Sequence, residues 1–266
     1  MSPVDKTNVT DKREDISRFV IHLTRDHGDK ALAEILEENT YRSARSNLIS
    51  ILKGRKVEAR NAHCLHGKKL NGVPQDIQNQ FKVVCFTEIP LHQIHQVIGH
   101  IEGRDIEFQP YGLVFRKRFL IEKGAQPAIY INSYQGNMFH RVGADALFAR
   151  ASADNFNDFS WRLLPLLNAM HEKYDFTWER EWRVCGDFAF DVSDIVCLIL
   201  PAEGDEDLKR VAAGAGVAAI SPGWTYEQIV AEMARQQRAT REKFEEELTK
   251  LKTAKQQPVS GEESAA

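Results

Sequence analysis

The sequence predicts an α+β fold, and three observations carry this prediction. Short runs rich in β-branched and aromatic residues outnumber the runs whose apolar residues recur at helical spacing. The predicted helices gather early in the chain and around residues 155–172, whereas a doubly wound parallel sheet would need one helix after almost every strand. With 266 residues, of which 42% are hydrophobic, the chain can bury a sizeable core as one large domain.

The strands and helices are predicted in the following order. The first strand is "RFVIHLTR" (18–25), and helical spacing follows over "ALAEILEENT" (31–40) and "SNLISILKG" (46–54). The remaining strands are short and rich in β-branched and aromatic residues; they are predicted over 82–91, 111–120, 127–132, 181–190 and 194–201.

The two ends of the chain differ from the domain between them. Residues 1–14 and 253–266 are small and polar and are predicted to be disordered tails, which leaves a single domain over 15–225. Residues 226–252 predict a long amphipathic helix, because its apolar residues fall on one narrow stripe: Ile229, Met233, Phe244, Leu248 and Leu251. This stripe suits either packing on the helix's own domain or a seam with a partner or a second copy, so a homo-oligomer through the C-terminal helix stays open.

Composition excludes some classes of protein and leaves others open. No apolar run approaches the ~20 residues of a membrane-spanning helix, and the polar start does not resemble a signal peptide, so we expect a cytoplasmic protein without a membrane partner. Its formal charge of −3 gives no global basic field. The basic segment 42–60 leaves nucleic acid open as a partner, although such runs are more often solvated surface. The widely spaced cysteines suit reduced thiols.

The segment "YDFTWEREWRVCGDF" (174–188) carries two carboxylates, Glu179 and Glu181, in what otherwise resembles a strand. Residues i and i+2 of a strand point to the same side, so we expect the two carboxylates to share one environment. On a solvated face they would form a charged edge with the nearby arginines. In a cleft they would form a catalytic device, because a carboxylate on a rigid strand can stabilise an oxocarbenium-like centre at C1 of a ribose.

Two other strands supply candidate binding residues. His22 and Thr24 share one face of the first strand, where they could bond a ribose and an amide of a ligand, although a lone strand histidine is more often structural. In "VVCFTEIPL" Thr87 lies near the strand end, with Cys85 on the same side, and a hydroxyl at a strand end is well placed to line a pocket.

The order of several short motifs resembles the AbiGi family of abortive phage-resistance proteins over roughly residues 16–200. The motifs are "VCFTEIPL", a histidine in the following helix (His100), "YGLVFRK", "GAQPAIYIN" and "EREWRV". The chain departs from that pattern by the insertion "IEGRDIEFQ" between His100 and "YG". The resemblance implies an antiviral function of the toxin–antitoxin type, with a cognate toxin or antitoxin or a phage protein as partner.

A more distant resemblance is to the ADP-ribosyltransferase fold, including DarT-like enzymes that modify DNA. It implies split antiparallel sheets flanked by helices that clamp NAD as a substrate. His22 and Thr24 would then hold the ligand, Thr87 would support the nicotinamide ribose, and Glu181 would be the catalytic carboxylate. Glu179 would activate the acceptor, which the sequence leaves open between nucleic acid, protein and water.

Two alternatives to an enzyme of this kind stay open. The chain could be a non-catalytic antitoxin or regulatory binding module that keeps the fold. It could also bind a metal through the clusters "HCLH" and "HQIH", although neither has a Cys-x-x-Cys knuckle. The residues of these two clusters are His63, Cys64, His66, His92 and His95.

Overall fold

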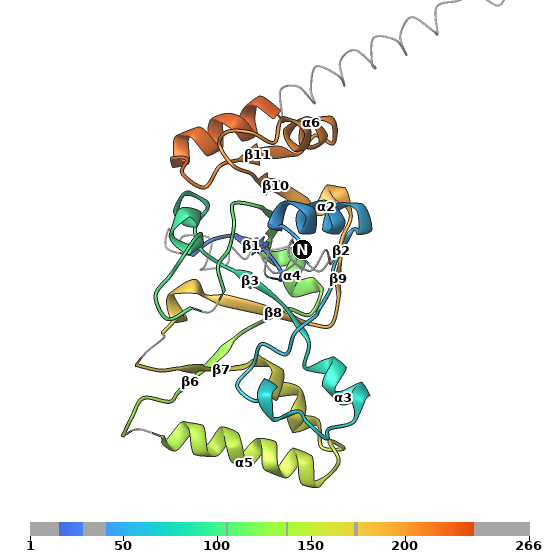
Figure 1. Ribbon diagram of the computed structural model, residues 1–266, viewed down its shortest axis with the longest axis vertical. Coiled ribbons are helices and arrows are strands. Elements are labelled where there is room, and N and C mark those ends of the chain that lie inside the picture. The colour runs from blue at the N-terminus through green and yellow to red at the C-terminus, as the bar shows by residue number, and fades with distance from the viewer. Residues whose placement is uncertain (1–15, 29–40, 105, 137, 173–174, 237–266) are drawn as a thin grey trace, which may run out of the picture.

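A seven-stranded mixed sheet lies at the centre of the computed structural model, which describes residues 16–28, 41–104, 106–136, 138–172 and 175–236 (Figure 1). The strand order across the sheet is β11-β10-β4-β1-β3-β8-β5, and neighbouring strands are antiparallel except for the parallel pair β10 and β11. The strands are β1 (Phe19–Leu23), β3 (Val83–Thr87), β4 (Gly112–Arg116), β5 (Gln126–Pro127), β8 (Glu181–Cys185), β10 (Ile195–Ile199) and β11 (Ala218–Ile220).

Two small sheets accompany the central one. β2 (Lys56–Val57) pairs antiparallel with β9 (Phe188–Ala189), and β6 (Ile129–Asn132) pairs parallel with β7 (Leu167–Met170). In Figure 1 the β6/β7 pair lies between β8 and the helix α5 (Phe139–Ala153). This pair therefore borders the end of the sheet that carries the candidate carboxylates.

Helices cover the sheets and fill the connections. The α-helices, besides α5, are α2 (Ala44–Gly54), α3 (Gln75–Gln80), α4 (Lys117–Glu122) and α6 (Glu206–Gly214), and residues 226–236 are also helical. The 3₁₀ segments are η2 (Gly67–Lys69), η3 (Leu91–Val97), η4 (Phe159–Leu166), η5 (Thr177–Glu179) and η6 (Val192–Asp194). None of the helices in the described part of the chain is long and apolar enough to cross a bilayer.

Alternation along the central strands gives the sheet two apolar faces. Val20 and Leu113 belong to one buried cluster, and their neighbours Ile21 and Val114 belong to the other. The first cluster contains a group of packed aromatic rings. The centroid of Phe188 lies 5.1 Å from those of Phe86 and Phe115, and the centroid of Phe190 also lies 5.1 Å from that of Phe115. A third cluster, around Phe81, Trp161 and Leu164, packs under α5.

The α+β prediction is confirmed in its coarse form, and several predicted boundaries are wrong. Segment 111–120 is a strand only as far as Arg116, because from Lys117 the chain turns into α4 and buries Leu120. Segment 181–190 breaks into β8 and β9 at Gly186, whose φ of +80° ends the strand. His100 is exposed and lies after η3, not in a helix.

The helix predicted around 155–172 is also wrong. The regular helix of this region is α5, which ends at Ala153, and Asn155 and Phe156 then adopt φ values of +47° and +58°. Residues 159–166 form η4, which contains Pro165, and 167–170 form β7. Proline lacks a backbone donor and disrupts a regular α-helix, so the apolar run here becomes a 3₁₀ segment and a strand.

The C-terminal amphipathic helix is described only over residues 226–236. Ile229 is 3% exposed, and it and Met233 pack against the second apolar cluster. The described part therefore lies on its own domain. The rest of the predicted helix, with Phe244, Leu248 and Leu251, lies outside the described residues, as do segment 31–40 and both predicted tails.

Candidate active site

Strand pairing places the candidate residues of β3 and β8 side by side. Thr87 lies opposite Glu181 and Cys85 opposite Arg183, while Phe86 and its partner on β8 point to the other face. Paired residues of antiparallel strands project to the same side. One face at the end of the sheet thus carries a hydroxyl, a thiol, a carboxylate and a guanidinium within two pairs of residues.

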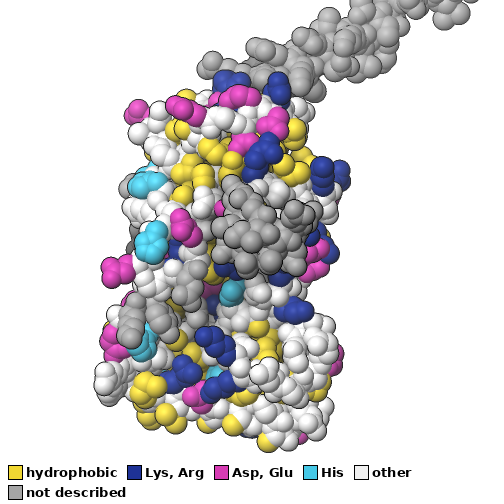
Figure 2. Space-filling model, viewed as in Figure 1, with side chains coloured by type: hydrophobic (Ala, Val, Ile, Leu, Met, Phe, Trp, Pro, Cys, Tyr) yellow, Lys and Arg dark blue, Asp and Glu magenta, His cyan; other side chains and the backbone are white. Residues whose placement is uncertain are grey.

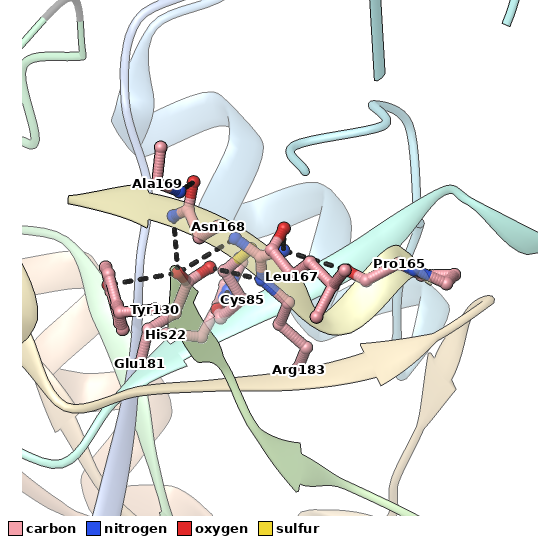
Figure 3. Close-up of polar contacts among 9 residues, drawn as sticks. All are labelled: His22, Cys85, Tyr130, Pro165, Leu167, Asn168, Ala169, Glu181 and Arg183. Carbon is pink, nitrogen blue, oxygen red and sulfur yellow. Dashed lines mark hydrogen bonds and ion pairs between the residues drawn. The ribbon is translucent and has the colours of Figure 1, made fainter. Parts of the chain in front are cut away.

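Glu181 is the centre of this group (Figure 3). Arg183 donates two hydrogen bonds to it, from Nε to Oε1 at 2.9 Å and from Nη2 to Oε2 at 3.0 Å. The hydroxyl of Tyr130 and the amide of Asn168 each lie 3.3 Å from Oε2. Tyr130 and Asn168 are themselves opposite each other in the β6/β7 pair, so that small sheet presents both donors to the carboxylate.

Arg183 ties the carboxylate to the rest of the fold. Its side chain is 1% exposed, and Nη1 donates to the carbonyl of Pro165 at 2.8 Å and to that of Leu167 at 3.3 Å. Four acceptors surround one planar guanidinium, which fixes the plane of the Glu181 carboxylate. The ion pair is therefore a rigid part of the site.

The charges of the pair govern the ionisation of the groups around it. Burial raises the pKa of Glu181, but the charge and hydrogen bonds of Arg183 outweigh burial and hold the pKa below its ordinary value. Burial and the Glu181 charge together raise the pKa of Tyr130 and of the Cys85 thiol. At neutral pH the site holds a carboxylate beside a protonated phenol and a protonated thiol.

The prediction that Glu179 and Glu181 share one strand is wrong. Glu179 ends the 3₁₀ turn η5, and Arg180 follows with a φ of +47°, so β8 begins only at Glu181. A residue in the left-handed region turns the chain out of the extended path that i, i+2 alternation requires. Burial raises the pKa of Glu179, and the nearby Glu181 charge raises it further against the opposing effect of Arg104.

Thr87 holds the turn that carries Glu179. Its hydroxyl donates to the backbone carbonyl of Glu179 at 2.5 Å, and the backbone N–H of Glu88 points to the same carbonyl at 3.4 Å. The end of β3 is thereby joined to η5. The Thr87 oxygen retains acceptor capacity for a ligand.

His22 lies at the junction of β1 and β3, where the two strands pair at a single position, Ile21 with Thr87. Alternation places His22 on the side of Phe86, with ring centroids 5.6 Å apart, and not on the side of Glu181. Its Nδ1 lies 2.9 Å from the carbonyl oxygen of Cys85 (Figure 3). Burial lowers the pKa of His22, so the ring is neutral, and because a carbonyl only accepts, Nδ1 carries the proton and Nε2 is an acceptor.

Thr24, the other predicted binding residue of β1, is 3% exposed. Its hydroxyl shares one proton between the carbonyls of Ala44, at 2.9 Å, and Tyr111, at 3.1 Å. These bonds tie the end of β1 to the start of α2 and to the entry of β4. The geometry gives Thr24 an anchoring role.

The histidine and cysteine clusters do not come together as a metal site. Within the described residues, no group of three or more His, Cys, Asp or Glu side chains is arranged to hold a metal ion. His66 is buried, its Nε2 lies 3.0 Å from Asp145 Oδ1, and its ring stacks on Phe148 with centroids 4.8 Å apart. Burial has the largest effect in lowering the pKa of His63, and the nearby charges of Arg25 and Arg183 lower it further.

Sequence reasoning missed three residues that contact the two carboxylates, Tyr130, Asn168 and Arg104, and it considered Arg183 only as part of a charged edge. It also missed Arg25, whose charge interacts with the Cys85 thiol. Arg25 follows β1, is partly buried, and has no carboxylate partner among the residues that the structure describes. A signal was available for Arg183: it stands two positions after Glu181 on a strand, so the same alternation rule predicts that the pair meets. Tyr130 and Asn168 had no such signal, because they come from distant strands.

Two cavities lie away from these residues. One, of about 190 Å³, is bordered by Leu200 and Trp224, and the other, of about 710 Å³, by Arg116, Phe119 and Met233. The candidate site is therefore defined by its charges and hydrogen bonds rather than by either cavity.

No family model, no curated protein and no solved structure matches this chain. The chemistry of the site must therefore be argued from its own residues.

Proposed function

We propose that this chain is an NAD-dependent ADP-ribosyltransferase or NAD glycohydrolase of an anti-phage, toxin–antitoxin type of system. The observation that carries the proposal is Glu181, a carboxylate that is only 13% exposed yet has a pKa below its ordinary value. Cleavage of the bond between nicotinamide and C1 of its ribose develops positive charge at that carbon. A buried, oriented anion stabilises such a charge more strongly than a solvated one.

The neighbouring groups suit the other parts of NAD. The acceptor nitrogen of His22 and the oxygen of Thr87 can take hydrogen bonds from ribose hydroxyls. The guanidinium of Arg25, partly buried without a carboxylate partner in the described chain, can pair with a diphosphate. Because His22 and Glu181 lie on opposite sides of β3, the substrate would have to cross the narrow junction between β1 and β3.

Glu179 is the candidate for activating the acceptor. Its pKa is raised, so it takes a proton more readily than an ordinary carboxylate, as a general base should. The acceptor class is not decided by segment 42–60, because most of its cations are paired within the chain: Arg45 with Asp205 and Asp207, Arg55 with Asp191, Lys56 with Asp187, and Arg60 with Glu58. Figure 2 shows Lys and Arg side chains gathered on the lower half of the face in view, in the region that lies between β6/β7 and α5 in Figure 1.

A second candidate function is a non-catalytic antitoxin or regulatory binding module. The observation that favours it is the full set of partners on Glu181: Arg183, Tyr130 and Asn168 already surround the carboxylate. A catalytic carboxylate must face its substrate. The two candidates differ in whether NAD displaces Tyr130 or Asn168 from Oε2.

Calorimetric titration with NAD and measurement of released nicotinamide would decide between them. We expect binding and release with the wild-type chain, with or without phage or host lysate, and loss of release in Glu181→Gln. Glu122→Gln, which removes a carboxylate from an exposed ion pair with Arg118, is the matched control and should behave as wild type. Absence of both binding and release under every condition would leave the binding module.

A further inference from the structure

Described residues on both sides of position 105, within and next to the segment "IEGRDIEFQ" (101–109), hold the guanidinium of Arg104 in place. Nε donates to the carbonyl of Ile106 at 2.7 Å and Nη2 to that of Val97 at 2.6 Å. The guanidinium carbon lies 4.9 Å from the centre of the Phe108 ring, and the backbone of Gly99 bonds that of Phe108 at 2.8 Å to close the loop. These contacts hold the guanidinium in place independently of any carboxylate.

The remaining nitrogen of this guanidinium points at Glu179. Arg104 Nη1 lies 2.9 Å from Glu179 Oε1, and the two side chains are 7% and 16% exposed. The pair is therefore largely shielded from solvent, where an ion pair interacts more strongly than at the surface. The same turn is held from the other side by the hydroxyl of Thr87.

We propose that Arg104 is a positioning residue for Glu179: it clamps both the carboxylate and the turn that carries it against the end of β3. The role assigned to Glu179 in acceptor activation rests on the proposed function, whereas the clamp does not. Without this cation Glu179 would be a buried carboxylate beside a second one, and such a group takes up a proton.

The ionisation of Glu179 depends on burial and on two charged groups, the cation of Arg104 and the second carboxylate, Glu181 from β8. The Glu179 charge in turn raises the pKa of Tyr130 from β6 and of the Cys85 thiol from β3. Of these groups Arg104 opposes protonation of Glu179, and burial and Glu181 favour it. Loss of Arg104 must then move the Glu179 titration to higher pH.

Carboxyl ¹³C NMR of glutamate-labelled protein tests this directly, with the Glu179 signal assigned by its absence in Glu179→Gln. We expect Glu179 to titrate at higher pH in Arg104→Gln and to return toward the wild-type value in Arg104→Lys, which restores the charge. Arg118→Gln, which removes the cation of an exposed 3.0 Å pair with Glu122, should leave the Glu179 titration unchanged. Arg104→Met, whose stem can still pack on Phe108, replaces Arg104→Gln if the latter does not fold. An unchanged Glu179 titration in a folded neutral variant overturns the proposal.

Activity measurements separate this inference from the proposed function. If Glu179 is the general base, the rate of transfer rises with pH around the pKa of Glu179. The rising part of the pH–rate profile should therefore move to higher pH in Arg104→Gln. A wild-type chain without NAD turnover, combined with the NMR shift, would refute the proposed function and leave the clamp. Turnover in the wild type with an unmoved titration in Arg104→Gln would refute the clamp and leave the function.

Discussion

Glu181 and Arg183, two positions apart on β8, form a two-bond ion pair at 2.9 and 3.0 Å in which the arginine is 1% exposed. The guanidinium also bonds the carbonyls of Pro165 and Leu167, so the pair joins the central sheet to the β6/β7 unit. The same carboxylate is both the candidate catalytic group and a structural connection. Under the proposed function, a substitution of Glu181 therefore changes activity and stability together.

The first prediction concerns stability. Glu181→Gln leaves Arg183 buried without its counter-charge, and breaking one side of a buried pair costs about 3–5 kcal/mol in the free energy of unfolding. Urea unfolding at neutral pH should show a decrease of this size. Glu122→Gln, on the exposed α4 pair, should change the free energy of unfolding by less than about 0.5 kcal/mol. Equal, small changes in both variants would mean that the Glu181 pair is solvated.

The second prediction separates the roles of the two carboxylates. Because the proposed function places Glu181 beside the developing charge, Glu181→Gln should lower nicotinamide release by about 10²–10³-fold, measured at a temperature where the variant is folded. Glu179→Gln should lose transfer to an acceptor and keep slow NAD hydrolysis, since water needs less orientation than a specific acceptor. Circular dichroism confirms folding in each assay. Identical loss of both activities in the two variants would contradict the division of roles, and full activity in both would exclude the site.

Local pattern predicted the central strands well, because alternation and β-branched content report directly on a half-buried sheet. β1, β3 and β10 lie within their predicted segments, and Cys85 and Thr87 project to the same side, as alternation requires. The sequence also places the late carboxylate of β8 correctly on a strand. Its neighbour Glu179 was placed wrongly, since nothing in "WEREW" marks Arg180 as left-handed; arginine seldom adopts that conformation.

The contacts that make the candidate site depend on tertiary structure. Tyr130 and Asn168 meet Glu181 only because β6 and β7 pair in parallel across an intervening helix, and a parallel register between segments so far apart leaves no local signature. Arg104 reaches Glu179 from a loop without regular structure. The sequence therefore identifies the carboxylates, but it does not identify the groups that control their charge.

The third prediction tests the anchoring role of Thr24. Thr24→Val keeps the shape of the side chain but removes the buried hydrogen bonding of the hydroxyl to the carbonyls of Ala44 and Tyr111, which costs about 0.5–1.5 kcal/mol in the free energy of unfolding. Thr24→Ser keeps the hydroxyl and should lose much less stability. NAD affinity, measured by calorimetry on folded protein, should be unchanged in Thr24→Ser and nearly so in Thr24→Val. A large loss of affinity with little loss of stability would instead make Thr24 a ligand-binding residue.

The fourth prediction is a loss of stability on mild acidification. Burial lowers the pKa values of His22 and His66 below the ordinary value of 6.5, although Asp145 opposes this effect at His66. In the unfolded chain both rings regain the ordinary value, so between the folded pKa and 6.5 the unfolded state binds more protons than the folded state. Stability therefore rises with pH in this window and falls as the pH drops below about 6.5.

Urea unfolding midpoints measured at several pH values between neutral and mildly acidic conditions check this sign. We expect the unfolding midpoint of the wild type to fall as the pH is lowered. The midpoint should fall less in His66→Gln, which removes one buried titrating ring, whatever the absolute stability of that variant. His140→Gln, on the exposed face of α5, is the matched control and should keep the wild-type pH dependence. An equal fall of the midpoint in the wild type and in His66→Gln would contradict a lowered pKa of the His66 ring.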